Sequence, residues 1–160
     1  GYFKQRLDRD GNQTEETSPW SPEQRAEPSH GRVSVTIEGR AVHVRAWRWW
    51  IQGVSGFRVP VLLLDTDLPG NSEWDRRLTD HLYGGDSHYR MCQEAILGIG
   101  GVRILASLGY SDIRTFHMNE GHSALLSLAL LEQRIGPNLG LATPQDLETV
   151  RHQCVFTTHT

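Results

Sequence analysis

In the stretch "TFHMNEGHSALL" (residues 115–126), an apolar run typical of a β-strand stops and a helical pattern begins. The junction consists of Asn119, Glu120, Gly121 and His122, which bring together an amide, a carboxylate, a glycine and an imidazole. Short polar groups at the end of a buried strand, beside a glycine that lets the backbone approach a ligand, are typical of binding sites. We therefore expect this junction to be functional.

The chain on both sides of the junction alternates between strands and helices. "FRVPVLLLD" (residues 57–65) is apolar on both faces, which is typical of a strand in a covered parallel sheet. Further strands are predicted over residues 113–118 and 154–159. Helices are predicted over residues 72–83, 87–109, 123–135 and 143–153. This order, with right-handed crossovers, predicts the α/β class and a Rossmann-like parallel sheet.

Capping residues and glycines refine the predicted helices. Asn71 is expected to cap the first of them, and Thr143 followed by Pro144 to begin the last. The long helix contains "GIGG" (residues 98–101), but a phosphate-binding loop would need the helix to start at these glycines. Because the helix is already under way there, we expect close packing against a neighbouring element instead.

The first third of the chain differs from the rest. Residues 1–31 are polar and rich in turn signals, so we expect a surface excursion whose proline-containing second half lacks regular structure. Residues 32–50 alternate apolar and polar positions on either side of a turn at Gly39, which predicts a β-hairpin. Its three tryptophans are expected to cap a hydrophobic core or a partner surface.

Composition excludes several classes of protein. The net charge of −3 and the pI near 6.2 give no reason to expect nucleic acid or an anionic membrane as a partner. The longest apolar run, residues 59–64, is too short to cross a bilayer, and no secretory signal opens the chain. Cys92 and Cys154 match no metal spacing and are expected to be small buried residues of a cytoplasmic protein. Both ends look cut, so we expect part of a larger protein.

Ligands of open α/β sheets bind outside the carboxyl ends of the strands. Here these ends carry Asp65-Thr66-Asp67, the junction at residues 119–122, and residues 157–160. Several short polar groups with few charges suit a sugar. Asp65 and Asp67 are expected to brace the following turn.

The histidines near these ends divide into two groups. His117 is expected to be structural or half exposed, whereas Glu120, His122 and His159 are expected to be functional. No metal is expected, because "HMNEGH" lacks the HExxH spacing of a zinc helix.

Taken in series, these segments resemble a known family. "HMNEGHSALL", followed two helices later by "VFTTHT", resembles the N-terminal domain of the α-glucan (glycogen, starch or maltodextrin) phosphorylases of the shorter bacterial and archaeal type. "GYFKQRLDRDGNQTE", "LLLDTDLPGNSEWDRRLTDHLYGGD" and "YRMCQEAILGIGGVRILASLGY" resemble the same family in the same order. The resemblance therefore spans essentially all 160 residues.

The resemblance implies a fold and an activity. Residues 1–160 would be part of the N-terminal Rossmann-like domain of a twin-domain (GT-B type) glycosyltransferase, with the hairpin as an excursion and residues 51–160 as β/α units. The enzyme would phosphorolyse terminal α-1,4 bonds of a glucan with inorganic phosphate, releasing glucose 1-phosphate. Pyridoxal phosphate would be bound by a lysine of the missing C-terminal domain, so this chain would contain no cofactor-binding residue. A homo-oligomer of the full-length protein is compatible with the family.

The resemblance also implies roles for single residues. His159 would be catalytic: its side chain would meet the glucosyl 6-hydroxyl, and its backbone carbonyl would lie near the reacting carbon. Asn119, Glu120, Gly121, His122 and Thr158 would bind the substrate. The family's glycine-rich segment, expected just before residue 1, and its proline-rich continuation are missing, so the fragment is not expected to be active alone. Two alternatives stay open, a non-catalytic carbohydrate-binding domain and a nucleotide-sugar glycosyltransferase.

Overall fold

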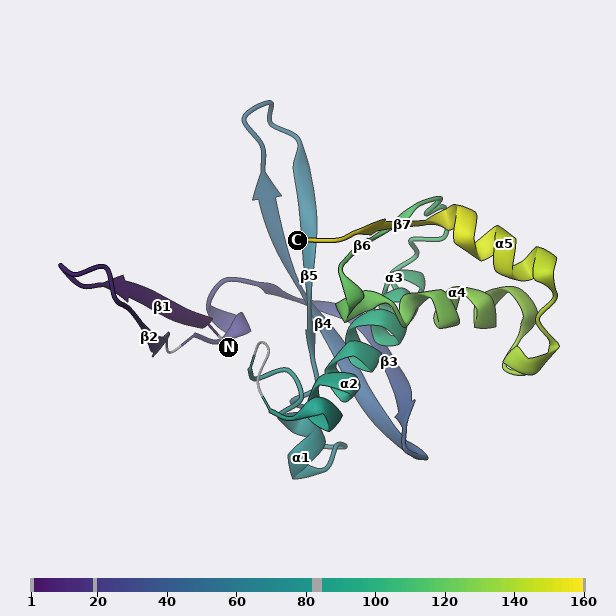
Figure 1. Ribbon diagram of the computed structural model, residues 1–160, viewed down its shortest axis with the longest axis horizontal. Coiled ribbons are helices and arrows are strands. Elements are labelled where there is room, and N and C mark those ends of the chain that lie inside the picture. The colour runs from purple at the N-terminus through teal and green to yellow at the C-terminus, as the bar shows by residue number, and fades with distance from the viewer. Residues whose placement is uncertain (1, 19, 82–84, 160) are drawn as a thin grey trace.

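The computed structural model describes residues 2–18, 20–81 and 85–159. The strands in these ranges are β1 (Tyr2–Leu7), β2 (Gln13–Ser18), β3 (Glu27–Ile37), β4 (Arg40–Gln52), β5 (Arg58–Asp65), β6 (Phe116–Asn119) and β7 (Cys154–Thr157). The α-helices are α1 (Glu73–Arg76), α2 (Ser87–Ala95), α3 (Gly101–Ser107), α4 (Leu126–Ile135) and α5 (Pro144–Gln153). Figure 1 shows the mixed α/β arrangement that they form.

The predicted β-hairpin is confirmed. Strands β3 and β4 pair antiparallel, with Ile37 opposite Arg40. Glu38 and Gly39 form the turn with φ angles of 50° and 80°, and two left-handed residues are what a tight two-residue hairpin requires. Both strands are longer than predicted, because β3 begins at Glu27 and β4 ends at Gln52.

The prediction of a parallel strand at residues 57–65 is wrong. Strand β5 pairs antiparallel with β4, from Arg45 opposite Asp65 to Gln52 opposite Arg58, in the sheet order β3-β4-β5. A short connection suffices for this pairing, whereas a parallel pair needs a long crossover. Only β6 and β7 pair in parallel among the described residues.

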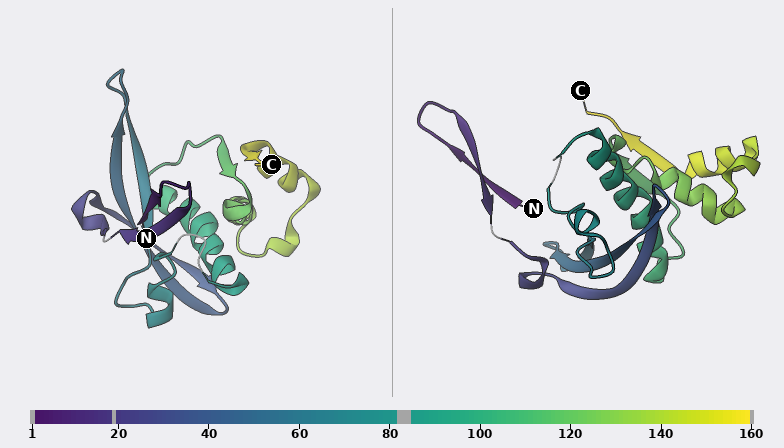
Figure 2. Two further views of the ribbon diagram at one scale, coloured as in Figure 1. Left: turned by 60° about the vertical axis from the view of Figure 1, so that its left-hand side comes forward. Right: turned by 90° about the horizontal axis from the view of Figure 1, so that it is seen from below.

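The N-terminal region contains more regular structure than predicted. Strands β1 and β2 form an antiparallel ribbon that stands apart from the other elements in Figure 1 and in the right-hand view of Figure 2. The Asp8 carboxylate organises the connecting turn by accepting hydrogen bonds from the backbone amides of Asp10 (2.9 Å) and Asn12 (2.8 Å). Strand β3 also begins within the segment expected to be irregular and runs through Pro28.

A long helix forms the centre of the structure. It runs from α2 through a π-helical turn, Ile96–Gly100, into α3, which confirms the predicted helix over most of its length. Strands β3 and β4 curve around it in the right-hand view of Figure 2. One hydrophobic core lies between this helix and the hairpin, with the buried residues Val35, Ile37, Val42, Val44, Leu78, Cys92 and Ile96.

A second core lies on the other side of the central helix. Its buried residues are Val102, Met118, Leu126, Ala129, Leu130, Leu131 and Val150, from α3, β6, α4 and α5. Ile99 packs against both cores. The prediction of close packing at the glycines is confirmed, because a Cβ atom on Gly98 would lie 2.6 Å from the backbone nitrogen of Leu126.

The helix ends follow the capping rules, with one correction. Thr143 caps α5 in a capping box with Asp146, as predicted. Ser72, not Asn71, caps α1. Asn71 instead accepts a hydrogen bond from the backbone amide of His43 (2.8 Å) and donates to the carbonyls of His43 and Thr66 (both 2.8 Å).

Two helices start or stop away from their predicted bounds. Helix α1 ends at Arg76, and the predicted helical residues 82 and 83 lie outside the described residues. Helix α4 begins at Leu126, later than predicted, because a separate 3-10 turn, Gly121–Ser123, precedes it.

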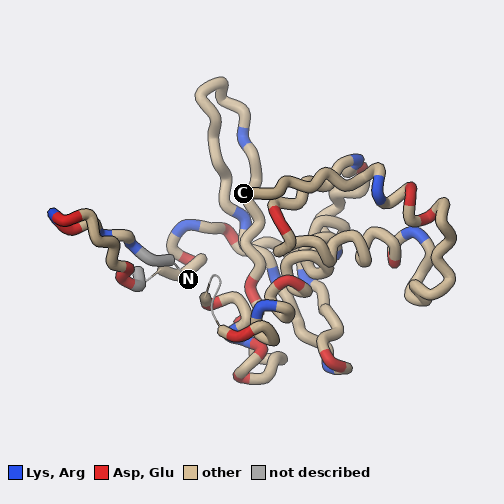
Figure 3. Tube along the Cα trace, in the orientation of Figure 1, with Lys and Arg blue, Asp and Glu red and all other residues tan. Residues whose placement is uncertain are grey.

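The tryptophans of β4 have different environments. Trp47 is buried and donates a hydrogen bond to Asp65 (2.8 Å), as a capping role predicts. Trp50 makes cation–π contacts with Arg48 and Arg58, whose guanidinium carbons lie 5.1 and 4.7 Å from its ring centroid. The distal part of the β4–β5 arm carries few charges, whereas both signs are interspersed over the rest of the trace (Figure 3). Within the described ranges, no helix combines the length and apolar character needed to span a bilayer.

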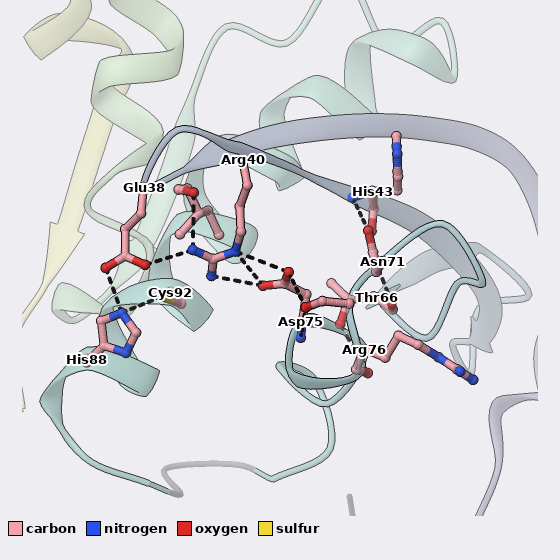
Figure 4. A network of polar contacts seen from close by, with 11 residues as sticks. Glu38, Arg40, His43, Thr66, Asn71, Asp75, Arg76, His88 and Cys92 are labelled. Carbon is pink, nitrogen blue, oxygen red and sulfur yellow. Dashed lines mark hydrogen bonds and ion pairs between the residues drawn. The ribbon is translucent and has the colours of Figure 1, made fainter.

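A polar network ties the β3–β4 turn to α1 and α2 (Figure 4). Arg40 donates to both carboxylate oxygens of Asp75 at 2.9–3.1 Å, and its remaining nitrogen donates to Glu38 at 2.7 Å. His88 completes the network at 2.8 Å from Glu38. Burial acts to raise the pKa of Asp75, but hydrogen bonds from Arg40 and Ser72 outweigh it and hold the pKa below its ordinary value.

The contact at Gly98 gives a first test. We expect Gly98→Ala to lower the free energy of unfolding by about 1–3 kcal/mol, because the new methyl group would collide with the backbone at Leu125 and Leu126. The matched control is Gly101→Ala, where a Cβ atom would meet only Leu64 at 4.0 Å. This control should raise stability by up to about 1 kcal/mol through helix propensity. Equal effects of the two variants in urea unfolding would contradict close packing at Gly98.

The buried ion pair gives a second test. Because the folded-state pKa of Asp75 is lowered, the pair stabilises the protein at neutral pH. This contribution declines once the pH falls below the ordinary aspartate pKa, and it is lost as the pH passes through the lower folded-state pKa. We expect Asp75→Asn to cost about 3 kcal/mol at pH 7 and to flatten the acid side of the stability profile. The control is Asp67→Asn, which removes an exposed pair with Arg76 and should cost less than about 1 kcal/mol. If the stability of the Asp75→Asn variant changed with pH in parallel with that of the unmodified chain, the stabilising role of the Asp75 carboxylate would be contradicted.

Candidate functional site

The candidate site lies at the carboxyl ends of β6 and β7. These strands pair in parallel with Asn119 opposite Thr157, so the residues that follow them emerge side by side. The structure thus brings together two of the three predicted strand ends, residues 119–122 and 157–159. Thr160 lies outside the described residues.

The third predicted strand end lies in the other sheet. Asp65 accepts hydrogen bonds from Arg45 (2.7 Å), Trp47 (2.8 Å) and the backbone amide of Asp67 (2.8 Å). Asp67 pairs with Arg76 at 2.6 Å. These contacts confirm that both carboxylates brace the turn after β5. They do not join the candidate site, because β5 is an antiparallel strand.

A hydrogen bond joins the two strand ends. The Nε2 atom of His159 lies 2.7 Å from Oδ1 of Asn119. Because Oδ1 can only accept, Nε2 carries the hydrogen, and the Nδ1 atom of a neutral imidazole is then an acceptor. Both side chains are exposed. The arrangement therefore presents a fixed imidazole acceptor to solvent, suited to a hydroxyl group.

Glu120 has a strained backbone. Its φ and ψ angles are 60° and −164°, a region that is essentially restricted to glycine. Its amide donates a hydrogen bond to the carbonyl of Thr157 at 2.9 Å, which extends the β6–β7 pairing by one residue. Gly121, which the sequence suggested as the conformationally special residue, has no positive φ angle. The sequence missed this strain, because nothing in the local pattern marks a glutamate for such a conformation.

His122 lies between two carboxylates. Its Nε2 atom is 3.5 Å from Glu120, and its Nδ1 atom is 3.6 Å from Glu94 of α2. The side chains of His122 and Glu94 are 28% and 26% exposed, so solvent only partly screens the imidazole from the carboxylates. Sequence analysis missed Glu94. The one sequence signal for Glu94 is that it lies four residues before Gly98. This spacing places Glu94 on the helix face that the glycine packs against a neighbouring element.

The remaining sequence-predicted residues lie around this group. Gly121 and Thr158 are exposed, and a Cβ atom on Gly121 would meet nothing within 4 Å. His117 is bonded to Thr157 at 2.5 Å, within the strand pair, which agrees with a structural role. In the described part of the chain, no group of His, Cys, Asp or Glu side chains is arranged to hold a metal ion.

A cavity of about 480 Å³ lies elsewhere, near the amino end of β6. Its lining combines apolar residues such as Leu105 and Phe116 with polar ones such as Gln133 and Thr149. Its one charged residue, Arg134, is already paired with Asp146 at 2.7 Å. None of the described polar residues at the carboxyl ends of β6 and β7 lines this cavity. We therefore place the candidate site at those strand ends and not in the cavity.

The chain is similar over its whole length to considerably longer proteins. It is 40% identical to the maltodextrin phosphorylase of Thermococcus litoralis and 39% identical to the glycogen phosphorylase of Mycobacterium tuberculosis, and it covers 19% of each. It is 30% identical to the glycogen phosphorylase of Aquifex aeolicus and covers 23% of it. The chain thus spans about a fifth of the length of these curated relatives. No family model matches the chain.

The strain at Glu120 can be measured directly. Glu120→Gly and Glu120→Ala both remove the carboxylate, but only glycine adopts the observed backbone angles without strain. We expect the glycine variant to be more stable than the alanine variant by about 1–2 kcal/mol in chemical denaturation.

The same two substitutions at Glu132 provide the control. Glu132 lies inside α4, where alanine should be the more stable residue by about 1 kcal/mol. If alanine were the more stable residue at both positions, Glu120 would not be strained.

Proposed function

We propose that this chain forms the sugar-binding wall of an α-glucan phosphorylase. It belongs along its whole length to the family of glycogen and maltodextrin phosphorylases. The observation that carries the proposal is the parallel pairing of β6 and β7, which brings His159 against Asn119. We further propose that these strands belong to the N-terminal Rossmann-like domain of a GT-B type enzyme. Ligands bind at such strand ends in open α/β sheets.

The proposed reaction is phosphorolysis of a terminal α-1,4 bond. An oxygen of inorganic phosphate bonds to the anomeric carbon of the terminal glucose, and the bond from that carbon to the glycosidic oxygen breaks. The glycosidic oxygen gains the proton that the attacking inorganic phosphate loses, and becomes the 4-hydroxyl of the shortened glucan. Positive charge develops on the sugar as the bond breaks, so the protein must orient the ring and stabilise that charge.

His159 and Asn119 are proposed to orient the sugar. The hydrogen bond between them holds the imidazole with Nε2 toward Asn119, so that Nδ1 can accept from a sugar hydroxyl, the 6-hydroxyl by the family resemblance. The backbone carbonyl of His159 would face the developing positive charge. A fixed orientation matters because a small misplacement of the reacting groups is costly in rate.

The turn after β6 is proposed to form the adjoining part of the wall. Glu120 offers carboxylate oxygens that accept from sugar hydroxyl groups, and His122 keeps this carboxylate in place at 3.5 Å. Gly121 leaves open space beside the backbone, since a Cβ atom there would meet nothing within 4 Å. Thr158 contributes a hydroxyl group beside His159. We propose positioning, and not proton transfer, for all of these residues.

Pyridoxal phosphate, which the family resemblance implies, is not matched by residues of this chain. A Schiff base needs a lysine, and the only lysine in the sequence is Lys4. It is exposed on β1, in the ribbon that stands apart from β6 and β7 (Figure 1). We therefore propose that any cofactor is held elsewhere in the complete protein, and the roles above concern the sugar alone.

An activity assay of the complete polypeptide tests the function. With maltooligosaccharide and inorganic phosphate, we expect release of glucose 1-phosphate that depends on both substrates. Binding of the oligosaccharide without this product would favour a carbohydrate-binding domain. Transfer from a nucleotide sugar without phosphorolysis would favour a nucleotide-sugar glycosyltransferase.

A substitution of His159 tests the assigned role. We expect His159→Ala to lower kcat by roughly 10²-fold, because the side chain that orients the sugar is lost while the backbone carbonyl remains. Pyridoxal phosphate content should stay unchanged, because His159 contacts the sugar. His152→Ala is the control, since His152 lies exposed on α5, before β7. Loss of the cofactor with normal kinetics of the remaining holoenzyme would contradict the assignment.

A further inference from the structure

We propose that Glu94 is a positioning residue of the candidate site, which acts by holding His122 against Glu120. It lies on α2, 28 positions before His122, and neither the family motifs nor the strand-end rule points to it. The consequence for catalysis rests on the proposed function. The geometric part, that Glu94 orients His122, does not.

The first observation is the placement of the three side chains. Each ring nitrogen of His122 faces a different carboxylate, Nδ1 facing Glu94 at 3.6 Å and Nε2 facing Glu120 at 3.5 Å. At these distances the attraction is electrostatic and not that of a short hydrogen bond. A carboxylate on each side favours this direction of the ring, because rotation of the imidazole would move both nitrogens away from their partners. His122 thereby connects the central helix to the strained residue at the end of β6.

The second observation is the close contact one helical turn beyond Glu94. Gly98 lies four residues later on the same helix face, where the backbone of Leu125 and Leu126 comes so near that a Cβ atom would lie 2.6 Å from a backbone nitrogen. The helix therefore has one fixed position against the chain that follows the turn. Glu94 is consequently delivered to His122 by a rigid element and not by a mobile loop.

The third observation is the strain at Glu120. A glutamate with a φ angle of 60° and a ψ angle of −164° persists only where its surroundings hold it. The hydrogen bond from its amide to Thr157 holds one side of the residue. The chain from Glu94 through His122 holds its carboxylate. Strain retained beside the proposed sugar-binding residues is the pattern expected of a pre-organised site.

A role in stability alone does not account for this arrangement. Partly exposed ion pairs contribute little to the free energy of unfolding, and the side chains of His122 and Glu120 are 28% and 39% exposed. Glu94→Gln should therefore leave the unfolding midpoint nearly unchanged. The contact of Glu94 with His122 is better explained by its effect on the orientation of Glu120 than by a contribution to the free energy of unfolding.

The test is a double-mutant cycle in the complete polypeptide. We expect Glu94→Gln to lower kcat/KM for the glucan roughly tenfold and to leave KM for inorganic phosphate unchanged. In a His122→Ala background, Glu94→Gln should change kcat/KM by less than about twofold, because no imidazole remains for Glu94 to orient. Equal losses in both backgrounds, or no loss in either, would overturn the proposal.

The control is Glu148→Gln, a matched change in a different glutamate–histidine pair. Glu148 lies 3.1 Å from His152 on α5, an exposed pair outside the candidate site. This variant should keep full kcat/KM. A tenfold loss for the control as well would show that any change of charge disturbs the enzyme, and would remove the case for Glu94.

A readout without turnover separates this proposal from the proposed function. In the 160-residue chain, Glu94→Gln should shift the imidazole nitrogen resonances of His122, whereas Glu148→Gln should shift only those of His152. If His122 responds but the complete polypeptide releases no glucose 1-phosphate, the proposed function fails and the orienting role stands. If His122 does not respond, the role of Glu94 is wrong whatever the activity.

Discussion

The close approach of the central helix to the backbone at Leu125 and Leu126 is the contact on which the other features depend. Gly98 permits it, because any side chain there would collide with the backbone. The contact lets one helix serve both hydrophobic cores, with Ile99 packed against each. It also sets the distance between α2 and the turn that follows β6. The same backbone approach thus determines core packing and site geometry.

The site combines a hydrogen-bonded amide–imidazole pair with a second imidazole that lies between two carboxylates. Asn119 and His159 join the strand ends by a single hydrogen bond and leave an acceptor toward solvent. Next to them, His122 lies between Glu120 and Glu94. On the proposed function, such a combination would bind hydroxyl groups in defined directions. That property agrees with a sugar ligand better than with a phosphate, for which basic groups would be needed.

The opposite end of the structure is held by different means. Arg40 and Asp75 form a nearly buried ion pair that connects the hairpin turn to α1, with Glu38 and His88 on its exposed side. Here the charges stabilise the folded state, as the lowered pKa of Asp75 indicates. At the candidate site the charges are more exposed and one backbone is strained. Stability and function are therefore assigned to different charged groups.

Much of this could be predicted from residues close together in the sequence. The alternation on both sides of Gly39 predicted the hairpin, the cap at Thr143 predicted the start of α5, and the apolar run ending at Asn119 predicted a strand with a polar end. Each of these depends on backbone geometry within a few residues. The family resemblance rests on the same local strings, and the relatives bear it out.

Only the tertiary structure decided which elements meet. Residues 57–65 read as a parallel strand, yet β5 pairs antiparallel with β4, because an apolar run shows burial but not its partner. Likewise, nothing near Glu94 in the sequence indicates His122, and nothing near Glu120 indicates its strained angles. These features arise from contacts between distant segments, whose free energy depends on the whole packing. The sequence by itself therefore determined the local elements and the family, and the packing decided how the site is held.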